Sequence, residues 1–164
     1  DLLLLARLDE GEALSKEPVD LANIVRDALS DAYVTSPDHD WGAQGVDEAV
    51  MVTGDSQSLH QVVVNLLANA RVHTPAGTRV EVRVKQNPQK TTLQVEDSGP
   101  GIPREDRKRL FQRFARADSS RARSSGSTGL GLSIIETIVK AHGGELKVET
   151  RENKGTEFLI QLPI

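Results

Sequence analysis

Three segments of the chain carry apolar residues at the spacing of an α-helix. The first is expected over Pro18–Tyr33. The second begins after Asp55, a candidate N-cap, and ends before Pro75. A third is expected over about Gly129–His142, where two glycines follow. The second helix has the longest apolar stripe, which should face the core and comprises Leu59, Val62, Val63, Leu66, Leu67 and Ala70.

Other segments alternate between apolar and polar residues, as β-strands do. Arg79–Gln86 and Thr91–Asp97 alternate on either side of a short turn, which predicts a hairpin. Two adjacent strands are expected near the C-terminal end, at Glu145–Thr150 and Thr156–Leu162. The remaining expected elements are short strands near 40–44 and 49–53, a helix over 103–114 and a polar loop over 115–128. Because hairpins pair their strands antiparallel, we predict an α+β fold in two layers, a mixed and mainly antiparallel sheet covered on one face by helices.

Composition narrows the class of protein. A length of 164 residues, with 37% hydrophobic and 27% charged residues, suits one globular domain. The net charge of -4, without any block of like charge, argues against nucleic acid as the main partner. The longest apolar run, Leu2 to Ala6, is far too short to cross a bilayer, so no membrane contact is expected. The absence of cysteine excludes disulfides and thiolate metal sites.

A column of polar side chains lies beside the apolar stripe of the second helix. Asn65, Asn69 and His73 are spaced i, i+4 and lie roughly a quarter turn from the centre of the stripe, at about 100° per residue. Two interpretations stay open for the asparagines. Their amides are solvated, or their oxygens help to hold a hydrated Mg²⁺ that phosphate groups bring in.

Asp97 ends a strand whose inward face also carries Leu93 and Val95. A buried carboxylate is costly unless its oxygens accept good hydrogen bonds. One interpretation is that Asp97 accepts only from the amides of the Ser98–Gly99 turn. The other is that it accepts from an amino group of a ligand, which Gly99 and Gly101 allow to approach the backbone.

Gly129 and Gly131 open the last expected helix, whose free N–H groups would suit a phosphate. The alternative is a flexible Gly/Ser linker. The segment is neither a Rossmann fingerprint nor a Walker-type loop. Arginines in or beside the preceding loop either form a solvated face or contact such a phosphate: Arg113, Arg116, Arg121 and Arg123.

The inventory of other catalytic motifs is short. The four histidines lie in different contexts without metal-ligand spacing, so each is expected to be structural or exposed: His39, His60, His73 and His142. The sequence contains no G-x-S-x-G elbow and no distinctive pair of carboxylates.

Taken in order, five motifs resemble the ATP-binding domain of sensor histidine kinases. NLLANA at 65–70 resembles the N box, and DSGPGI at 97–102 resembles the first glycine box. FQRF at 111–114, TGLGLSI at 128–134 and GTEF at 155–158 resemble the F box, the second glycine box and the closing glycine motif. The resemblance covers about Pro18–Ile164 and implies the Bergerat fold, which gyrase-type ATPases, chaperones and mismatch-repair ATPases share.

The resemblance also implies ATP and Mg²⁺ as cofactors. By that analogy Asp97 would take the adenine amino group, Asn69 would ligate Mg²⁺ and Asn65 would assist at the metal. Phe111 and Phe114 would anchor a lid. Arg116 would contact the γ-phosphate, backbone N–H groups of 129–132 would bind the phosphates, and Thr156 would lie near Asp97. The full implied ATP-binding set is Asn65, Asn69, His73, Asp97, Gly99, Gly101, Ile102, Phe114, Arg116, Thr128, Gly129, Leu130, Gly131, Leu132 and Thr156.

The sequence departs from the family pattern at three places. Val72 and His73 stand where relatives often have Lys and an aromatic residue that stacks on adenine, and Ser127 stands where they often have Gly. Hydrolysing ATPases of the superfamily usually carry a water-activating glutamate at the position of Asn65. Because an amide is a poor general base, slow hydrolysis and transfer of the γ-phosphoryl group to a histidine are expected.

Residues 1–14 resemble the end of a dimerisation helix, and we expect the ATP-binding domain over 18–164. The family's phosphoacceptor motif is absent from this chain, so these residues alone should not autophosphorylate. The implied partners are the dimerisation domain of the same homodimeric kinase and a response regulator that takes the phosphoryl group from the histidine. The implied location is the cytoplasmic side of a membrane-anchored sensor. The alternatives are a nucleotide-binding switch or anti-sigma-type serine kinase, and a chaperone-like or gyrase-like ATPase, which Asn65 disfavours.

Overall fold

A computed structural model describes residue 6 and residues 14–101, 131–151 and 154–163. Its elements are β1 (Glu17–Asp20), α2 (Leu21–Thr35), β2 (Asp40–Gln44), β3 (Met51–Gly54), α3 (Ser56–His73), β4 (Arg79–Gln86), β5 (Lys90–Asp97), α6 (Gly131–Ala141), β6 (Glu145–Arg151) and β7 (Gly155–Pro163). Five strands form one sheet in the order β2-β4-β5-β7-β6, and β1 pairs with β3 in a separate two-stranded sheet. None of the described helices combines the length and apolar character needed to cross a bilayer.

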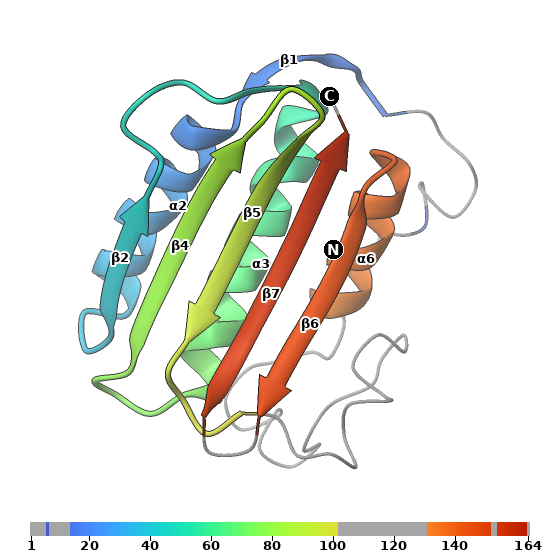
Figure 1. The fold of residues 1–164 in the computed structure, drawn as a ribbon. Coiled ribbons are helices and arrows are strands. Elements are labelled where there is room, and N and C mark those ends of the chain that lie inside the picture. The colour runs from blue at the N-terminus through green and yellow to red at the C-terminus, as the bar shows by residue number, and fades with distance from the viewer. Residues whose placement is uncertain (1–5, 7–13, 102–130, 152–153, 164) are drawn as a thin grey trace.

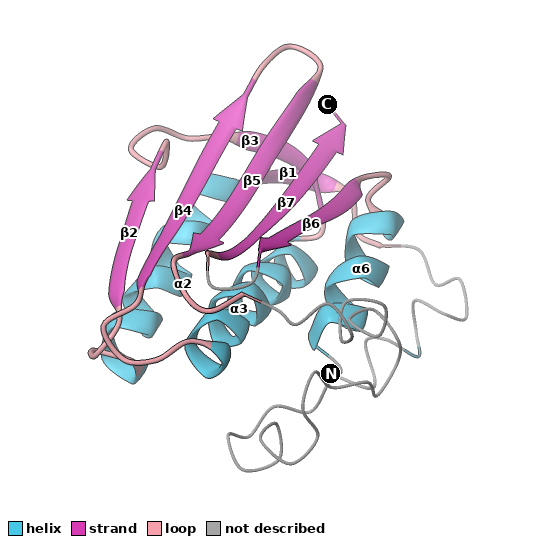
Figure 2. Ribbon diagram, turned by 60° about the horizontal axis from the view of Figure 1, so that its bottom comes forward, coloured by secondary structure: helices cyan, strands magenta, loops and turns pink. Residues whose placement is uncertain are grey.

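The domain has two layers, as predicted. Figure 1 shows the five-stranded sheet in front and α2, α3 and α6 behind it, and Figure 2 shows the three helices together on one side. Among the strands that the structure describes in this sheet, only β2 and β4 pair parallel, whereas β4–β5, β5–β7 and β6–β7 pair antiparallel. The predicted α+β class, with a mixed and mainly antiparallel sheet, is therefore confirmed.

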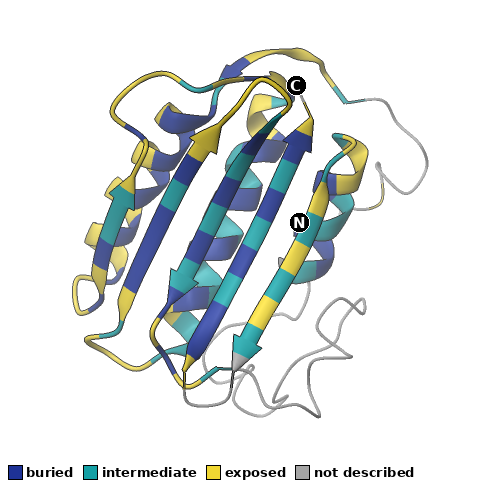
Figure 3. Ribbon diagram, viewed as in Figure 1, coloured by how far each residue is buried: buried dark blue, intermediate teal, exposed yellow. Residues whose placement is uncertain are grey.

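The core lies between the sheet and the helices. Burial alternates along β5 and β7, so every second side chain faces the helices (Figure 3). All six residues of the apolar stripe predicted for α3 are buried. They meet a sheet face lined by Val80, Val82, Val84, Leu93, Val95, Phe158, Ile160 and Leu162. Removing this apolar surface from water is the main contribution to folding.

The first helix begins three residues later than predicted. Pro18–Asp20 belongs to β1, and α2 begins at Leu21. The Asp20 carboxylate caps the helix by accepting hydrogen bonds from the N–H groups of Ala22 (3.0 Å) and Asn23 (3.3 Å). The same oxygen accepts from the N–H of Val50 (3.0 Å). The apolar stripe extends through this region, but the capping aspartate decides where the helix starts.

The other predicted elements agree closely with the structure. The short strands near 40–44 and 49–53 are β2 and β3, and the hairpin and the two C-terminal strands are present. Asp55 precedes α3, but its side chain caps no backbone N–H and accepts from the Ser58 hydroxyl at 2.6 Å instead. The helix predicted over 103–114 and the loop over 115–128 lie outside the described residues.

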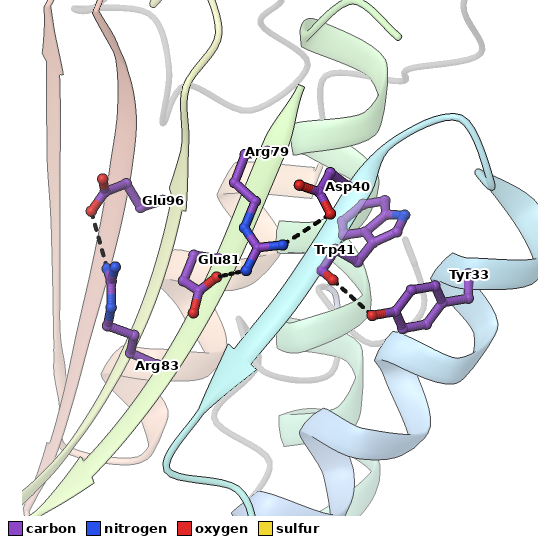
Figure 4. A network of polar contacts seen from close by, with 7 residues as sticks. All are labelled: Tyr33, Asp40, Trp41, Arg79, Glu81, Arg83 and Glu96. Carbon is purple, nitrogen blue, oxygen red and sulfur yellow. Dashed lines mark hydrogen bonds and ion pairs between the residues drawn. The ribbon is translucent and has the colours of Figure 1, made fainter. Parts of the chain in front are cut away.

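Ion pairs on the open face of the sheet hold the edge strand β2 in place. Arg79 on β4 bridges Asp40 on β2 (2.9 Å) and Glu81 (2.6 Å), as Figure 4 shows. Behind β2, the Tyr33 hydroxyl donates to the Trp41 carbonyl oxygen at 2.7 Å. The edge strand is therefore fixed to its neighbour on one side and to α2 on the other.

Replacing Asp20 by Ala should lower the free energy of unfolding by about 1–2 kcal/mol, because three N–H groups lose their acceptor. These bonds lower the pKa of Asp20, the Val50 N–H most. A carboxyl with a lowered folded-state pKa stabilises the fold above its unfolded pKa and loses that contribution as the pH falls. Urea unfolding at pH 7 and at about pH 3 should therefore show a large difference between wild type and variant at pH 7 and a small one at pH 3.

Asp27→Ala is the matched control, since Asp27 is exposed on the same helix. It should change the free energy of unfolding by less than about 0.5 kcal/mol. Equal effects of the two substitutions would contradict the role given to Asp20.

Candidate functional site

The predicted polar column lies along α3 beside its buried stripe. Asn65 and Asn69 are half-buried, and His73 is exposed. Gln61, one turn before Asn65, donates from Nε2 to the Asn65 Oδ1 at 2.8 Å and so orients that amide. Asn69 makes no hydrogen bond to any residue that the structure describes. Its amide oxygen has the hardness that Mg²⁺ prefers and lies at the surface of the helix rather than in the core.

Asp97 ends β5 on the inner face of the sheet, where strand alternation predicts it. Its side chain is only 8% exposed, and Oδ1 accepts the Gly99 N–H at 2.9 Å. Burial raises the pKa of Asp97, and the backbone N–H groups of Gly99 and Thr156 oppose this rise. The predicted acceptance from the turn is therefore confirmed. The interaction with a ligand amino group remains a prediction.

Two neighbouring strands and the end of α3 surround Asp97. Thr156 on β7 is its register partner, so it lies beside Asp97 as predicted. Gly155 precedes it with φ +98°, and a methyl group at that position would collide with the Asp97 carbonyl oxygen. A methyl group built on Gly99 would lie 2.6 Å from Cγ2 of Thr74, the residue that follows α3. The close packing of the chain around Asp97 therefore depends on two glycines.

The structure describes only part of the motif predicted to bind phosphate. Gly131 begins α6, which confirms a helix at the predicted place, and Leu132 is half-buried against the core. Gly101 lies in the loop after β5 with φ +78°. The other implied ATP-site residues lie outside the described residues: Ile102, Phe114, Arg116, Thr128, Gly129 and Leu130. Their roles remain predictions.

The described candidates converge at one end of the molecule. In Figure 1 the C-terminal ends of α3 and β5, and the first residues of β7 and α6, all lie at the bottom of the view. The structure thus brings Asp97, Gly99 and Thr156 together and places the asparagine column on the adjoining helix. Sequence reasoning missed Gln61 and Thr74. Gln61 is detectable by its i, i+4 spacing from Asn65, whereas the contact of Thr74 with the Gly99 loop depends on tertiary structure.

Two of the histidines are structural, as predicted. The Nε2 of His142 accepts the Asp55 N–H at 3.1 Å, and its Nδ1 contacts the Ile138 carbonyl oxygen at 2.8 Å. His142 thereby ties the end of α6 to the start of α3. His39 is buried beside Trp41.

Comparison with known families decides the class. The family described as histidine kinase-, DNA gyrase B- and HSP90-like ATPase matches residues 54–164. This segment contains the asparagine column, Asp97 and Thr156. The chain belongs to this ATPase family. The predicted resemblance is therefore confirmed, and with it the expectation that the domain binds ATP.

Relatives of this ATPase domain are sensor histidine kinases. The probable sensor histidine kinase TcrY of Mycobacterium tuberculosis is 52% identical over 164 residues, which are 100% of this chain and 34% of the relative. The sensor histidine kinase TrcS of the same organism is 46% identical over 169 residues, which are 100% of this chain and 33% of the relative. The chain thus spans about a third of the length of these curated relatives. The names of these relatives favour a histidine kinase domain over the anti-sigma-type alternative.

Solved structures of histidine kinases share the fold. The mycobacterial sensor histidine kinase MprB is 35% identical, with a TM-score of 0.77 over 90% of this chain and 97% of the other. The catalytic domain of histidine kinase ThkA is 28% identical, with a TM-score of 0.76 over 90% of this chain and 95% of the other. The fold shown in Figure 1 therefore matches most of the solved ThkA catalytic domain.

Gly155→Ala should destabilise this ATPase domain by more than about 3 kcal/mol, because a left-handed backbone and a collision with the Asp97 carbonyl act together. Gly77→Ala is the matched control. Gly77 has φ +86°, but nothing lies within 4 Å of an added methyl group. It should cost only about 1 kcal/mol, from backbone strain alone. Chemical denaturation measures both changes, and equal losses would contradict the close approach of Gly155 to Asp97.

Proposed function

We propose that this domain binds Mg-ATP and donates the γ-phosphoryl group to a histidine on the dimerisation domain of a sensor histidine kinase. The observation that carries the proposal is the buried Asp97 carboxylate at the end of β5, beside Gly99 and Thr156, in a chain of this ATPase family. Oδ1 of this carboxylate accepts a hydrogen bond from the Gly99 N–H. The carboxylate can also accept a hydrogen bond from the exocyclic amino group of adenine.

The cost of burying Asp97 supports a role in binding. Burial raises its pKa, so ionisation in the fold costs free energy that an apolar residue would not. An amino group of a bound base would supply a donor and offset part of that cost. Asp97 recognises the base in this proposal and takes no part in bond breaking.

The asparagine column fits a magnesium ion carried by phosphates. Asn69 offers an amide oxygen, and Asn65, whose oxygen is oriented by Gln61, lies one turn before it. Mg²⁺ keeps several waters and takes few protein ligands, so one or two amides suffice. When bound, the ion would neutralise charge on the β- and γ-phosphates. We propose that backbone N–H groups of 129–132 and the guanidinium of Arg116 complete the phosphate contacts.

In phosphoryl transfer, a ring nitrogen of the acceptor histidine would form a bond to the γ-phosphorus. The bond between the γ-phosphorus and the β–γ bridging oxygen would break, and ADP would leave. Asn65 cannot act as a general base, so water is poorly activated and the phosphoryl group is kept for the histidine. The proposed partners are the dimerisation domain of a homodimeric kinase, whose last helix would end at about residue 14, and a response regulator. We place the domain on the cytoplasmic side of a membrane-anchored sensor.

A solved relative supports nucleotide binding by this fold. Full-length ShkA, 26% identical with a TM-score of 0.77, was determined in complex with AMPPNP, and it matches 99% of this chain. Because this chain resembles ShkA in sequence and fold, adenine nucleotides are the first ligands to test here.

Asp97→Asn should weaken ATP binding by about ten- to a hundredfold, because the amide meets the adenine amine donor to donor. Isothermal titration calorimetry with Mg-ATP measures this. Since the folded-state pKa of Asp97 is raised, its ionised form lends the fold no stability at pH 7, and the variant should unfold no more readily than wild type. Glu96→Gln is the control, because Glu96 lies on the opposite face of β5 and should leave ATP affinity unchanged. Equal affinity of the Asp97 variant and wild type would refute the adenine assignment.

Mixing this chain with the dimerisation domain of its own kinase and labelled Mg-ATP should label the acceptor histidine. Chelation of Mg²⁺ and, separately, Asn69→Ala should each abolish most of the label, because the phosphates lose their counterion or its ligand. Labelling that survives both treatments would rule out the metal site on α3.

A further inference from the structure

Thr74 connects α3 to the loop that holds Asp97. It is the first residue after α3, and its hydroxyl donates to the Ala70 carbonyl oxygen at 2.5 Å. Its methyl carbon, Cγ2, and Asp97 Oδ1 both lie within 3.0 Å of the point where a methyl group on Gly99 would stand. The Thr74 methyl therefore packs directly against Gly99, whose N–H holds the carboxylate.

His39 and the Ala70 carbonyl oxygen together hold the Thr74 hydroxyl. Its Nε2 lies 2.9 Å from the Thr74 Oγ1. Because the single hydroxyl proton is donated to Ala70, the oxygen accepts here, and His39 carries its proton on Nε2. The other ring nitrogen, Nδ1, is buried and has no hydrogen-bond partner among the described residues, although the Asp38 carboxylate lies 3.5 Å away.

The surroundings of His39 keep it in place. Its ring stacks on Trp41 with centroids 5.6 Å apart, and the Trp41 indole donates to the Ser36 carbonyl oxygen at 2.9 Å. Two backbone hydrogen bonds join the loop that contains His39 to the loop that follows Thr74. The Gly77 N–H donates to the backbone carbonyl oxygen of Asp38 (2.6 Å), and the Asp40 N–H donates to that of Thr78 (3.0 Å). His39 and Thr74 thus lie in two loops that are hydrogen-bonded to each other, and Thr74 contacts Gly99.

A purely structural role would not require a histidine at this position. An apolar ring of similar size would stack on Trp41 without leaving a buried Nδ1 unsatisfied, which carries a desolvation cost. What the imidazole supplies and an apolar ring does not is an Nε2–H that, together with the Ala70 carbonyl oxygen, holds the Thr74 hydroxyl and so the direction of its methyl.

We propose that His39 and Thr74 are positioning residues that make the site selective for a purine with an exocyclic amino group. His39 fixes Thr74, the Thr74 methyl backs Gly99, and the Gly99 N–H aims the Asp97 carboxylate at that amino group. The inference rests on the proposed function, because it needs a nucleotide at Asp97. It concerns recognition of the base, not transfer of the phosphoryl group.

The test compares Mg-ATP with Mg-ITP, whose base carries an oxygen in place of the amino group, by calorimetry on this chain. His39→Phe should weaken ATP binding about three- to tenfold and ITP binding by less, so that the ATP-to-ITP affinity ratio falls. His39→Gln, whose amide can donate from nearly the same place as Nε2, should restore the ratio. Thr74→Ser keeps the hydroxyl but removes the methyl against Gly99, so it should lower the ratio and provides the second test if His39→Phe does not fold.

His142→Phe is the matched control. His142 also bridges two elements by hydrogen bonds, but at the other end of α3, about 27 Å from Thr74 along an 18-residue helix. It should lower stability without changing the ratio. An unchanged ratio in folded His39→Phe or in Thr74→Ser, or an equal loss for both nucleotides, would overturn the proposal. A wild-type chain that fails to bind ATP would instead overturn the proposed function on which it rests.

Discussion

The apolar inner face of the five-stranded sheet must be removed from water, and three of the described helices do this from one side. α3 lies centrally in this layer and presents its whole stripe from Leu59 to Ala70 to the sheet. One face of α3 packs on the sheet, so the adjacent face of the helix lies where the buried core ends and solvent begins. The same packing that buries the stripe thus sets Asn65 and Asn69 at the border between core and solvent.

The covered row on β5 ends in a charged residue, and this determines the character of the site. Leu93 and Val95 are buried, as apolar residues on the inner face usually are, and Asp97 in the next inward position is buried as well. The turn that follows returns one N–H to its carboxylate, and burial still raises its pKa. The fold therefore carries a cost in stability at the place where a ligand can supply the missing donor.

The open face of the sheet shows a different balance of charge. Four glutamates form one row across four strands, in the register Glu81, Glu96, Glu157 and Glu149. Like charges in opposing positions repel one another. Arg79 and Arg83 pair with the first two, whereas at Glu157 partial burial and the carboxylates of Glu149 and Glu96 raise the pKa. The helix-covered face thus supplies most of the stability, and the open face contributes solubility and the anchoring of β2.

Residue order alone predicts the elements and the faces on which their residues lie. Periods of 3.6 and 2 are local properties, so the stripe of α3, the inward direction of Asp97 and the mainly antiparallel sheet all follow from residue order. The first helix was placed too early, because its start depends on Asp20, which also binds the distant Val50 N–H. Residue order does not predict the close approach of Gly155 to the Asp97 carbonyl, or the hydrogen bond between His39 and Thr74, whose methyl packs against Gly99. Those contacts join residues far apart along the chain, and close packing of layers, which no local period encodes, brings them together.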